Sequence, residues 1–222
     1  MPLPHSTLVF ALAMCIAAPA VAQGAQQDNL STNARLLVAA RNADEAALKR
    51  EIANGAAIDS RNRLGESTLV IVLKKDRPDL AVLVLDAGAD VNLAAVNGIT
   101  PLMAAAYGGY DDIVKRLLAK GANVAAVDRL GKNAMTYAAG EGRTAVVVTL
   151  LAAGVDPNGV YTNDLTALMW AAGFGKIEAV KALLAAGANP ALKDNRGKTA
   201  ADIARDQGHT ATVATLEAAR AR

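Results

Sequence analysis

The stretch Thr100 to Lys132, TPLMAAAYGGYDDIVKRLLAKGANVAAVDRLGK, decides the fold because it recurs in altered form every 33 residues. One period later the chain continues from Thr166 to Lys198 as TALMWAAGFGKIEAVKALLAAGANPALKDNRGK. Glycines mark the same period, since five of them are separated by 33 residues and each follows a run of helical periodicity: Gly55, Gly88, Gly121, Gly154 and Gly187. A fixed period of this length indicates a solenoid of stacked repeats.

Each unit is expected to form two helices joined by a turn. Thr100 is a good N-cap, and Pro101 suits the first helical position because the N–H that proline lacks would be unsatisfied there. The pair Gly108–Gly109 is expected to end this helix. A second, amphipathic helix follows, and Gly121 just beyond it is predicted to adopt the left-handed conformation that glycine adopts without a side-chain penalty.

The unit resembles the ankyrin repeat in its T-P-L-x-x-A-A opening, in a helix that ends in L-L-x-x-G-A, and in a finger that closes with D-x-x-G. Five copies in register carry the resemblance. It implies an all-α solenoid of stacked helix-turn-helix units with β-hairpin fingers. Together with the N-terminal segment, it suggests a small bacterial ankyrin protein of the exported type.

One departure from the ankyrin pattern concerns the fourth position of the repeat, where a histidine that bonds the opening threonine is usual. Other residues stand at this position here: Leu37, Val70, Met103, Thr136, Met169 and Asp202. We therefore expect that hydrogen-bond network to be absent and apolar packing to replace it.

The repeat register divides the chain as follows: a signal peptide 1–22, a flexible leader 23–33, repeats 34–66, 67–99, 100–132, 133–165 and 166–198, and a C-terminal cap 199–220. Arg50 and Glu51 make the second helix of repeat one unusually polar, as an end repeat with one face toward water requires. Asp164 replaces the finger glycine of repeat four, so this finger is predicted to be the most irregular and mobile. Thr199 and Asp202 have the spacing of a capping box.

The N-terminal segment has the pattern of a secretory signal peptide. An apolar run, Leu8 to Ala18, ends at Pro19, and Ala20–Val21–Ala22 supplies the small residues of a cleavage site, although no Lys or Arg precedes the run. The run is too short to span a bilayer comfortably, so no stable membrane insertion is expected after cleavage. Cys15 allows an alternative, lipidation, but Met14 is too large for the usual lipoprotein motif. The prediction is a periplasmic or secreted protein without cysteine.

Sequence patterns give little support for catalysis. After cleavage His209 would be the single histidine, and without a cysteine a Ser-His or Cys-His pair is nearly excluded. No group of residues has metal-ligand spacing, and Asp111–Asp112 at a helix start suits the helix dipole. The formal charge of +2 makes no general case for nucleic acid. We therefore predict no enzyme, no metal and no cofactor.

Two surface features are candidates for a binding site. The first is a basic group near the N-terminal end, which an alternative interpretation treats as a solvated face diluted by acidic neighbours: Arg61, Arg63, Lys74, Lys75 and Arg77. The second is aromatic, because every aromatic residue after the signal peptide lies in repeats three to five: Tyr107, Tyr110, Tyr137, Tyr161, Trp170 and Phe174.

The ankyrin resemblance implies that residues eight and nine of each repeat, together with the finger tips, face a partner. The candidate protein-binding residues are therefore Tyr107, Arg129, Leu130, Tyr137, Glu141, Thr162, Asn163, Trp170 and Phe174, with Arg63, Lys74 and Lys75 at the basic end. Tyr137 and Trp170, one period apart, are expected to stack side by side, or else to fill gaps in the core.

Three functions remain open at this stage. The first is an exported monomer that binds another protein through its concave face and has no activity of its own. The second is an effector secreted to act on a host protein by binding. The third, a small hydrolase within the repeat frame, requires a site that the sequence does not contain.

Overall fold

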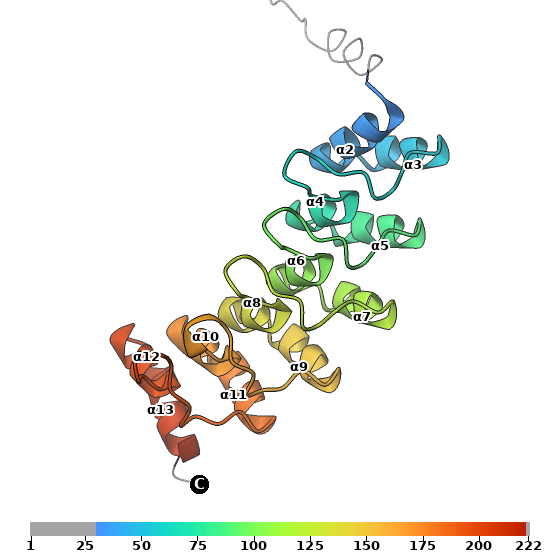
Figure 1. The fold of residues 1–222 in the computed structure, drawn as a ribbon. Helices are drawn as coiled ribbons and strands as arrows, with labels where there is room; N and C mark the ends of the chain where they lie inside the picture. The colour runs from blue at the N-terminus through green and yellow to red at the C-terminus, as the bar shows by residue number, and fades with distance from the viewer. Residues whose placement is uncertain (1–29, 221–222) are drawn as a thin grey trace, which may run out of the picture. The chain divides into compact units, whose positions relative to one another are not determined.

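The computed structural model describes residues 30–220, in which consecutive helices pair and the pairs stack in chain order (Figure 1). The helices are α2 (Thr32–Asn42), α3 (Glu45–Ala53), α4 (Thr68–Lys74), α5 (Pro78–Asp86), α6 (Pro101–Gly108), α7 (Asp111–Ala119), α8 (Ala134–Glu141), α9 (Thr144–Ala152), α10 (Ala167–Gly173), α11 (Ile177–Ala185), α12 (Ala200–Asp206) and α13 (Thr210–Arg220). The described residues contain no strand, so the predicted all-α solenoid is confirmed. The predicted signal peptide lies outside the described residues, and α2 begins at Thr32, within the segment predicted as a leader.

The first helices of the pairs pack in one row, in the order α2, α4, α6, α8, α10 and α12. Alanines at the contact allow close approach, as at Ala105 and Ala106, which are both fully buried. Each repeat also buries one long side chain at the same position of its first helix: Leu36, Leu69, Leu102, Met135 and Leu168. Full burial of such a side chain contributes ~1.5–3 kcal/mol, so the row is held by one periodic apolar seam.

The predicted helix boundaries of repeat three are confirmed. The Thr100 hydroxyl accepts a hydrogen bond from the Met103 N–H at 3.2 Å, and Pro101 occupies the first turn. Gly109 ends α6 with φ of 82°, and Gly121 follows α7 with φ of 83°. Both are left-handed conformations that cost an L-residue ~1–2 kcal/mol, which explains why glycine recurs at these positions.

The prediction that no side chain bonds the helix start at the fourth position is wrong in three places, one of which is the long bond from the Thr166 N–H to Met169 Sδ at 3.5 Å. Thr136 accepts from the Asn133 N–H at 3.0 Å, and an Asp202 oxygen accepts from the Thr199 N–H at 3.0 Å, which completes capping boxes. A side chain three residues into a helix faces the backbone N–H of the cap, so any acceptor there can bond it. The capping box predicted at Thr199 is confirmed.

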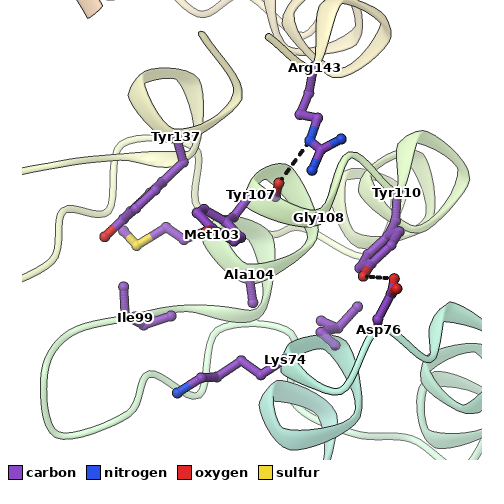
Figure 2. A pocket seen from close by; sticks show the side chains of 11 residues that line it. Lys74, Asp76, Ile99, Met103, Ala104, Tyr107, Gly108, Tyr110, Tyr137 and Arg143 are labelled. Atoms are coloured by element: carbon purple, nitrogen blue, oxygen red, sulfur yellow. Dashed lines mark hydrogen bonds between the residues drawn. The ribbon is translucent and has the colours of Figure 1, made fainter. Parts of the chain in front are cut away.

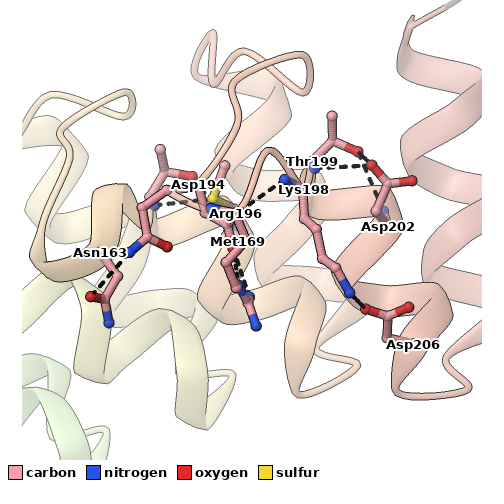
Figure 3. A network of polar contacts seen from close by, with 10 residues as sticks. Asn163, Met169, Asp194, Arg196, Lys198, Thr199, Asp202 and Asp206 are labelled. Carbon is pink, nitrogen blue, oxygen red and sulfur yellow. Dashed lines mark hydrogen bonds and ion pairs between the residues drawn. The ribbon is translucent and has the colours of Figure 1, made fainter.

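The described fingers contain no strand, which corrects the predicted β-hairpins, and each is closed by one backbone hydrogen bond, such as that from the Asp128 N–H to the Lys132 carbonyl at 2.8 Å, together with side-chain bonds. Asp194 Oδ1 accepts from the N–H groups of Arg196 and Lys198, each at 2.9 Å (Figure 3), and Asp128 does the same in repeat three. An Asx side chain that occupies these backbone donors substitutes for a ladder. The described fingers contain only isolated bridges, at Arg61 with Ser67 and at Val160 with Thr166.

The finger of repeat four is irregular, as predicted. A single 3₁₀ turn spans Thr162–Asp164, and Asn163 and Asp164 have φ of 62° and 58°. Asn and Asp tolerate this region better than other residues with side chains. The predicted mobility of this finger stays a prediction.

Adjacent fingers are linked at their tips by hydrogen bonds. The Val96 N–H donates to the Leu64 carbonyl at 2.9 Å, and the Arg129 N–H donates to the Asn97 carbonyl at 3.0 Å. A hydroxyl makes the next link, from Thr162 Oγ1 to the Leu130 carbonyl at 2.8 Å. The tips thus form a continuous row beside the first helices.

A second row of links joins the loops that follow the second helices. The Asn123 N–H donates to Asn92 Oδ1 at 2.8 Å, and the Asn189 N–H donates to Asn158 Oδ1 at 2.7 Å. No corresponding bond joins repeats three and four within residues 30–220, because Ala125 stands where Asn92 and Asn158 stand in their repeats.

Repeat one differs from the expected solvent-facing cap because Glu51 is buried. Its carboxylate accepts from Arg35 Nε and from Arg50 Nε, each at 3.0 Å. Burial raises the pKa of Glu51, but the hydrogen bonds and charges of the two arginines outweigh burial and hold the pKa below its ordinary value. A buried Glu51 therefore forms ion pairs with Arg35 of α2 and with the exposed Arg50 of α3.

Candidate functional site: an aromatic row on the first helices

The first helices of repeats three to five carry the exposed aromatic residues of the stack. Tyr107 on α6 is 53% exposed, and Phe174 at the end of α10 is 55% exposed. Tyr137 and Trp170 lie between them in chain order and are half-buried against the core. We call these four residues the aromatic row.

The ring contacts differ from those predicted, because Tyr137 and Trp170 do not stack on each other. Tyr107 and Tyr137 meet edge to face with ring centroids 6.1 Å apart, and Trp170 and Phe174 are stacked at 6.1 Å with planes 11° apart. Helix axes pack ~8–10 Å apart, too far for parallel rings at one register to touch. Tyr137 instead contacts Tyr107 near the C-terminal end of α6, and Trp170 contacts Phe174 just after α10.

Lys132 connects the two aromatic pairs. Its Nζ lies 4.4 Å from the Trp170 ring centroid and 5.6 Å from that of Tyr137. Attraction between an ammonium and an aromatic face contributes ~0.5–1 kcal/mol at an exposed site. The row is therefore a sequence of aromatic, cationic and aromatic side chains, and sequence reasoning missed Lys132 as its central member.

Tyr137 is also fixed by its hydroxyl, which donates to Asp128 Oδ2 at 2.6 Å. Burial, and then the acceptance of this bond by Asp128, raise the pKa of Tyr137 well above its ordinary value. The phenol stays neutral and is held as a donor. Because Asp128 also closes the finger of repeat three, Tyr137 is tied to that finger by hydrogen bonds.

A pocket of about 490 Å³ lies beside Tyr107, between α4, α6 and α8 (Figure 2). Apolar side chains of Leu73, Ile99 and Met103 line it together with Tyr107 and Tyr137. We call this the aromatic pocket. Its apolar walls suit a large uncharged side chain.

Polar residues surround one end of the aromatic pocket. The Tyr110 hydroxyl donates to Asp76 Oδ1 at 2.5 Å, and Arg143 Nε donates to the Tyr107 carbonyl at 3.0 Å (Figure 2). Burial, followed by the bond to Asp76, raises the pKa of Tyr110 to about 12. Sequence reasoning did not assign Asp76 or Arg143 to the aromatic surface. Their register could have indicated it, since Arg77, Tyr110, Arg143 and His209 share one repeat position and each bonds back to the preceding repeat.

The predicted finger-tip residues lie at the surface but are joined to neighbouring fingers. Arg129, Thr162 and Asn163 are exposed, Leu130 is 64% exposed, and Glu141 is half-buried. The links between fingers use the Thr162 hydroxyl and Asn163 Oδ1 as well as backbone groups, so the side chains of Arg129 and Leu130 are the more accessible of these to a partner.

The basic end is partly neutralised within the chain. Lys74 Nζ pairs with Glu66 at 2.5 Å and Arg77 pairs with Asp79 at 2.5 Å, while Arg61 donates to the carbonyls of Gly65 and Ala94. Arg63 and Lys75 are exposed and make no ion pair with another residue in the described range. Three of the five residues of the predicted basic group therefore have structural partners within the chain.

Comparison with known families identifies the repeat. Three overlapping matches to the model for ankyrin repeats (3 copies) cover residues 36–128, 69–161 and 135–220. The chain belongs to the ankyrin repeat family. Nothing in the comparisons points to a bacterial exported type, since the relatives found are animal proteins.

Three curated relatives illustrate the match. The chain is 38% identical to mouse (Mus musculus) Inversin over 102 residues, which are 44% of this chain and 10% of that protein. It is 33% identical over 81 residues to the bovine (Bos taurus) Inactive serine/threonine-protein kinase TEX14, covering 36% and 5%. It is 42% identical over 60 residues to human (Homo sapiens) Ankyrin repeat and KH domain-containing protein 1, covering 27% and 2%. The chain thus matches a tenth or less of each of these relatives.

The described part of this ankyrin chain holds no group of three or more metal-ligating side chains. His209, the lone histidine in that part, contacts the Gly173 carbonyl at 3.2 Å. Asp111 pairs with Lys115 at 2.6 Å and accepts from Thr149. None of the helices within residues 30–220 is both long and apolar enough to cross a bilayer.

Proposed function

We propose that this ankyrin protein is a non-catalytic binding protein that holds a partner protein against the aromatic row and the adjacent finger tips. Ankyrin repeats generally mediate interactions between proteins and are typically non-catalytic. The proposed surface comprises the first helices of repeats three to five.

The observation that carries this proposal is the exposure of Tyr107 and Phe174. The structure gives neither side chain a core position, yet each is oriented by a second ring. Ordered, exposed aromatic side chains lose little conformational entropy on binding and dominate many interfaces. Their concentration on one row of helices favours a protein partner.

The test begins with cross-linking in the native compartment and identification of the partner by mass spectrometry. Capture of that partner is then compared for wild type and for Tyr107→Ala combined with Phe174→Ala. We expect at least tenfold weaker binding, ~1.4 kcal/mol, with a nearly unchanged melting temperature. A stable double variant that captures the same partner as well as wild type would place the site elsewhere, and the exposed Arg63 and Lys75 would be examined next.

We also propose that the protein is exported to the periplasm or secreted as a monomer after cleavage at Ala22. The small residues Ala20 and Ala22, at the positions recognised in signal peptides, support this. Amino-terminal sequencing should find Gln23 as the first residue, and Ala22→Tyr should leave an uncleaved precursor. Intact Met1 on the soluble protein, or a lipid on Cys15, would contradict the proposal.

A further inference from the structure

A second pocket of about 480 Å³ lies next to the aromatic pocket and has different chemistry. It is bounded by α2, α4 and the first finger, and Lys74 lines both pockets. The two are related by the repeat, since Arg41 and Lys75 of the second pocket correspond to Lys74 and Gly108 of the aromatic pocket. We call the second one the basic pocket.

The basic pocket has an excess of positive charge. Its ionisable lining residues are Arg41, Lys74, Lys75 and Glu66. The single carboxylate is already occupied, because Glu66 pairs with Lys74 at 2.5 Å and accepts from Asn62 at 2.7 Å. Burial raises the pKa of Glu66, but these bonds outweigh it and keep the pKa below its ordinary value. Arg41 and Lys75 make no ion pair within residues 30–220, so they remain available to an anion.

The distance between the two pockets matches the spacing of side chains along one extended segment of a partner. Packed helices lie ~8–10 Å apart, and the pockets are one repeat apart along the first-helix row. An extended peptide in the polyproline II conformation has about 3 residues per turn and rises ~3.1 Å per residue. Side chains three residues apart therefore lie on the same side of such a segment and roughly 9 Å from each other, so both pockets can be reached by one segment.

We propose that the two pockets bind a single extended segment of the partner, with an acidic side chain in the basic pocket and a large apolar side chain in the aromatic pocket. The inference rests on the proposed function and specifies the chemistry of its partner. Charge complementarity selects the acid, since Arg41 and Lys75 lack an internal carboxylate. The exposed ring of Tyr107, beside the half-buried Ile99 and Tyr137, selects the apolar anchor by the area that it can bury with it.

The test uses a display library of random dodecapeptides and the purified protein. Enriched peptides should contain Asp or Glu about three residues from an aromatic or aliphatic residue. Synthetic labelled peptides of the enriched pattern are then measured by fluorescence anisotropy, beside matched peptides in which Lys replaces the acid or Ala replaces the anchor. We expect each replacement to weaken binding at least tenfold.

Three variants test which pocket recognises the acidic residue and which recognises the apolar anchor. Lys75→Glu should weaken acidic peptides at least tenfold and bind the Lys peptides better than wild type does. Tyr107→Ala should lose the preference for the apolar anchor but keep that for the acid. Lys120→Ala, at the exposed end of α7 in the other row, should bind like wild type. Melting curves confirm that each variant is folded.

Several outcomes would overturn the inference. These are failure to enrich any peptide, enrichment without acidic residues, or unchanged charge preference in Lys75→Glu. Sedimentation with phosphatidylglycerol vesicles that Lys75→Glu abolishes would assign the basic pocket to a lipid surface instead. If the cross-linked partner depends on Tyr107 and Phe174 while acidic peptides do not compete, the proposed function stands and this inference alone fails.

Discussion

The first two repeats and repeats three to five use the same helix pair with different chemistry on the row of first helices. In the former the row carries Arg41, Lys74 and Lys75, and the turn residues Ala43 and Asp76 are strained at φ of 55° and 58°. In the latter it carries aromatic residues, and the turns use glycine. The buried seam is the same throughout. Fold and surface are therefore encoded at separate positions of the repeat.

The substitution with the largest expected effect disrupts the contact between the fingers of repeats two and three, where the two regions meet. In Gly98→Ala the new Cβ would lie 2.8 Å from the Asp128 backbone, at a φ of 84°. Left-handed strain of ~1–2 kcal/mol and overpacking of ~1–3 kcal/mol together predict a loss of about 3 kcal/mol in the free energy of unfolding. Urea denaturation measures it.

Gly121→Ala is the matched control for Gly98→Ala. Its φ is 83° but no atom lies within 4 Å of the new Cβ, so only the strain of ~1–2 kcal/mol should appear. Lys120→Ala beside it should be nearly silent. Equal effects at Gly98 and Gly121 would show that the fingers of repeats two and three do not pack as described.

The second prediction concerns the ion pairs that Glu51 makes in repeat one. Glu51→Gln should cost about 2 kcal/mol at neutral pH, because charge-assisted hydrogen bonds to Arg35 and Arg50 are lost. Since the folded-state pKa of Glu51 is below its ordinary value of 4.5, its contribution is present above that pH and is lost as pH falls through the folded pKa.

The measurement for Glu51 is stability as a function of pH in wild type and variant. The difference between them should shrink as the solution is acidified below pH 4.5. Hydrogen exchange should locate the change in α2 to α4 and leave the aromatic repeats unaffected. A constant difference at all pH values would show that Glu51 acts through packing.

The smallest effect concerns Lys132. Lys132→Met removes the ammonium over Trp170 but keeps much of the side-chain length, so stability should fall by only ~0.5–1 kcal/mol. Trp170 is the sole tryptophan, and its fluorescence spectrum should shift in this variant. An unchanged spectrum would mean that Lys132 does not lie on the ring.

The parts of the fold that could be predicted from the sequence depend on residues that recur at fixed positions of the repeat. Thr100, Pro101 and Gly121 act through local backbone geometry, so one repeat sufficed to place them. Contacts between repeats were harder, because Tyr137 and Trp170 share a register that favours stacking while the helix spacing prevents it. Lys132 and Arg143 were missed since their roles depend on side chains that cross to a neighbouring repeat.

The finger closure was missed for a related reason. The D-x-x-G pattern predicts a turn but does not say whether Asp128 points outward or accepts backbone N–H groups. Likewise Asp202 was assigned to a capping box while the equivalent Thr136 was not, because Asn133 replaces the usual threonine in that repeat. The role of the predicted protein-binding residues stays a prediction.

The alanine at position 125 has a mechanical consequence. A stack with equal links at every joint bends evenly, whereas one that lacks a link bends where it is missing. Ala125 interrupts the row of Asn links between repeats three and four, so in the second-helix row this joint relies on the bond from Thr149 Oγ1 to Asp111, and we expect the solenoid to flex there when that bond is removed. Tyr107 precedes the joint and Phe174 follows it, so a partner that contacts both residues would restrict bending between repeats three and four.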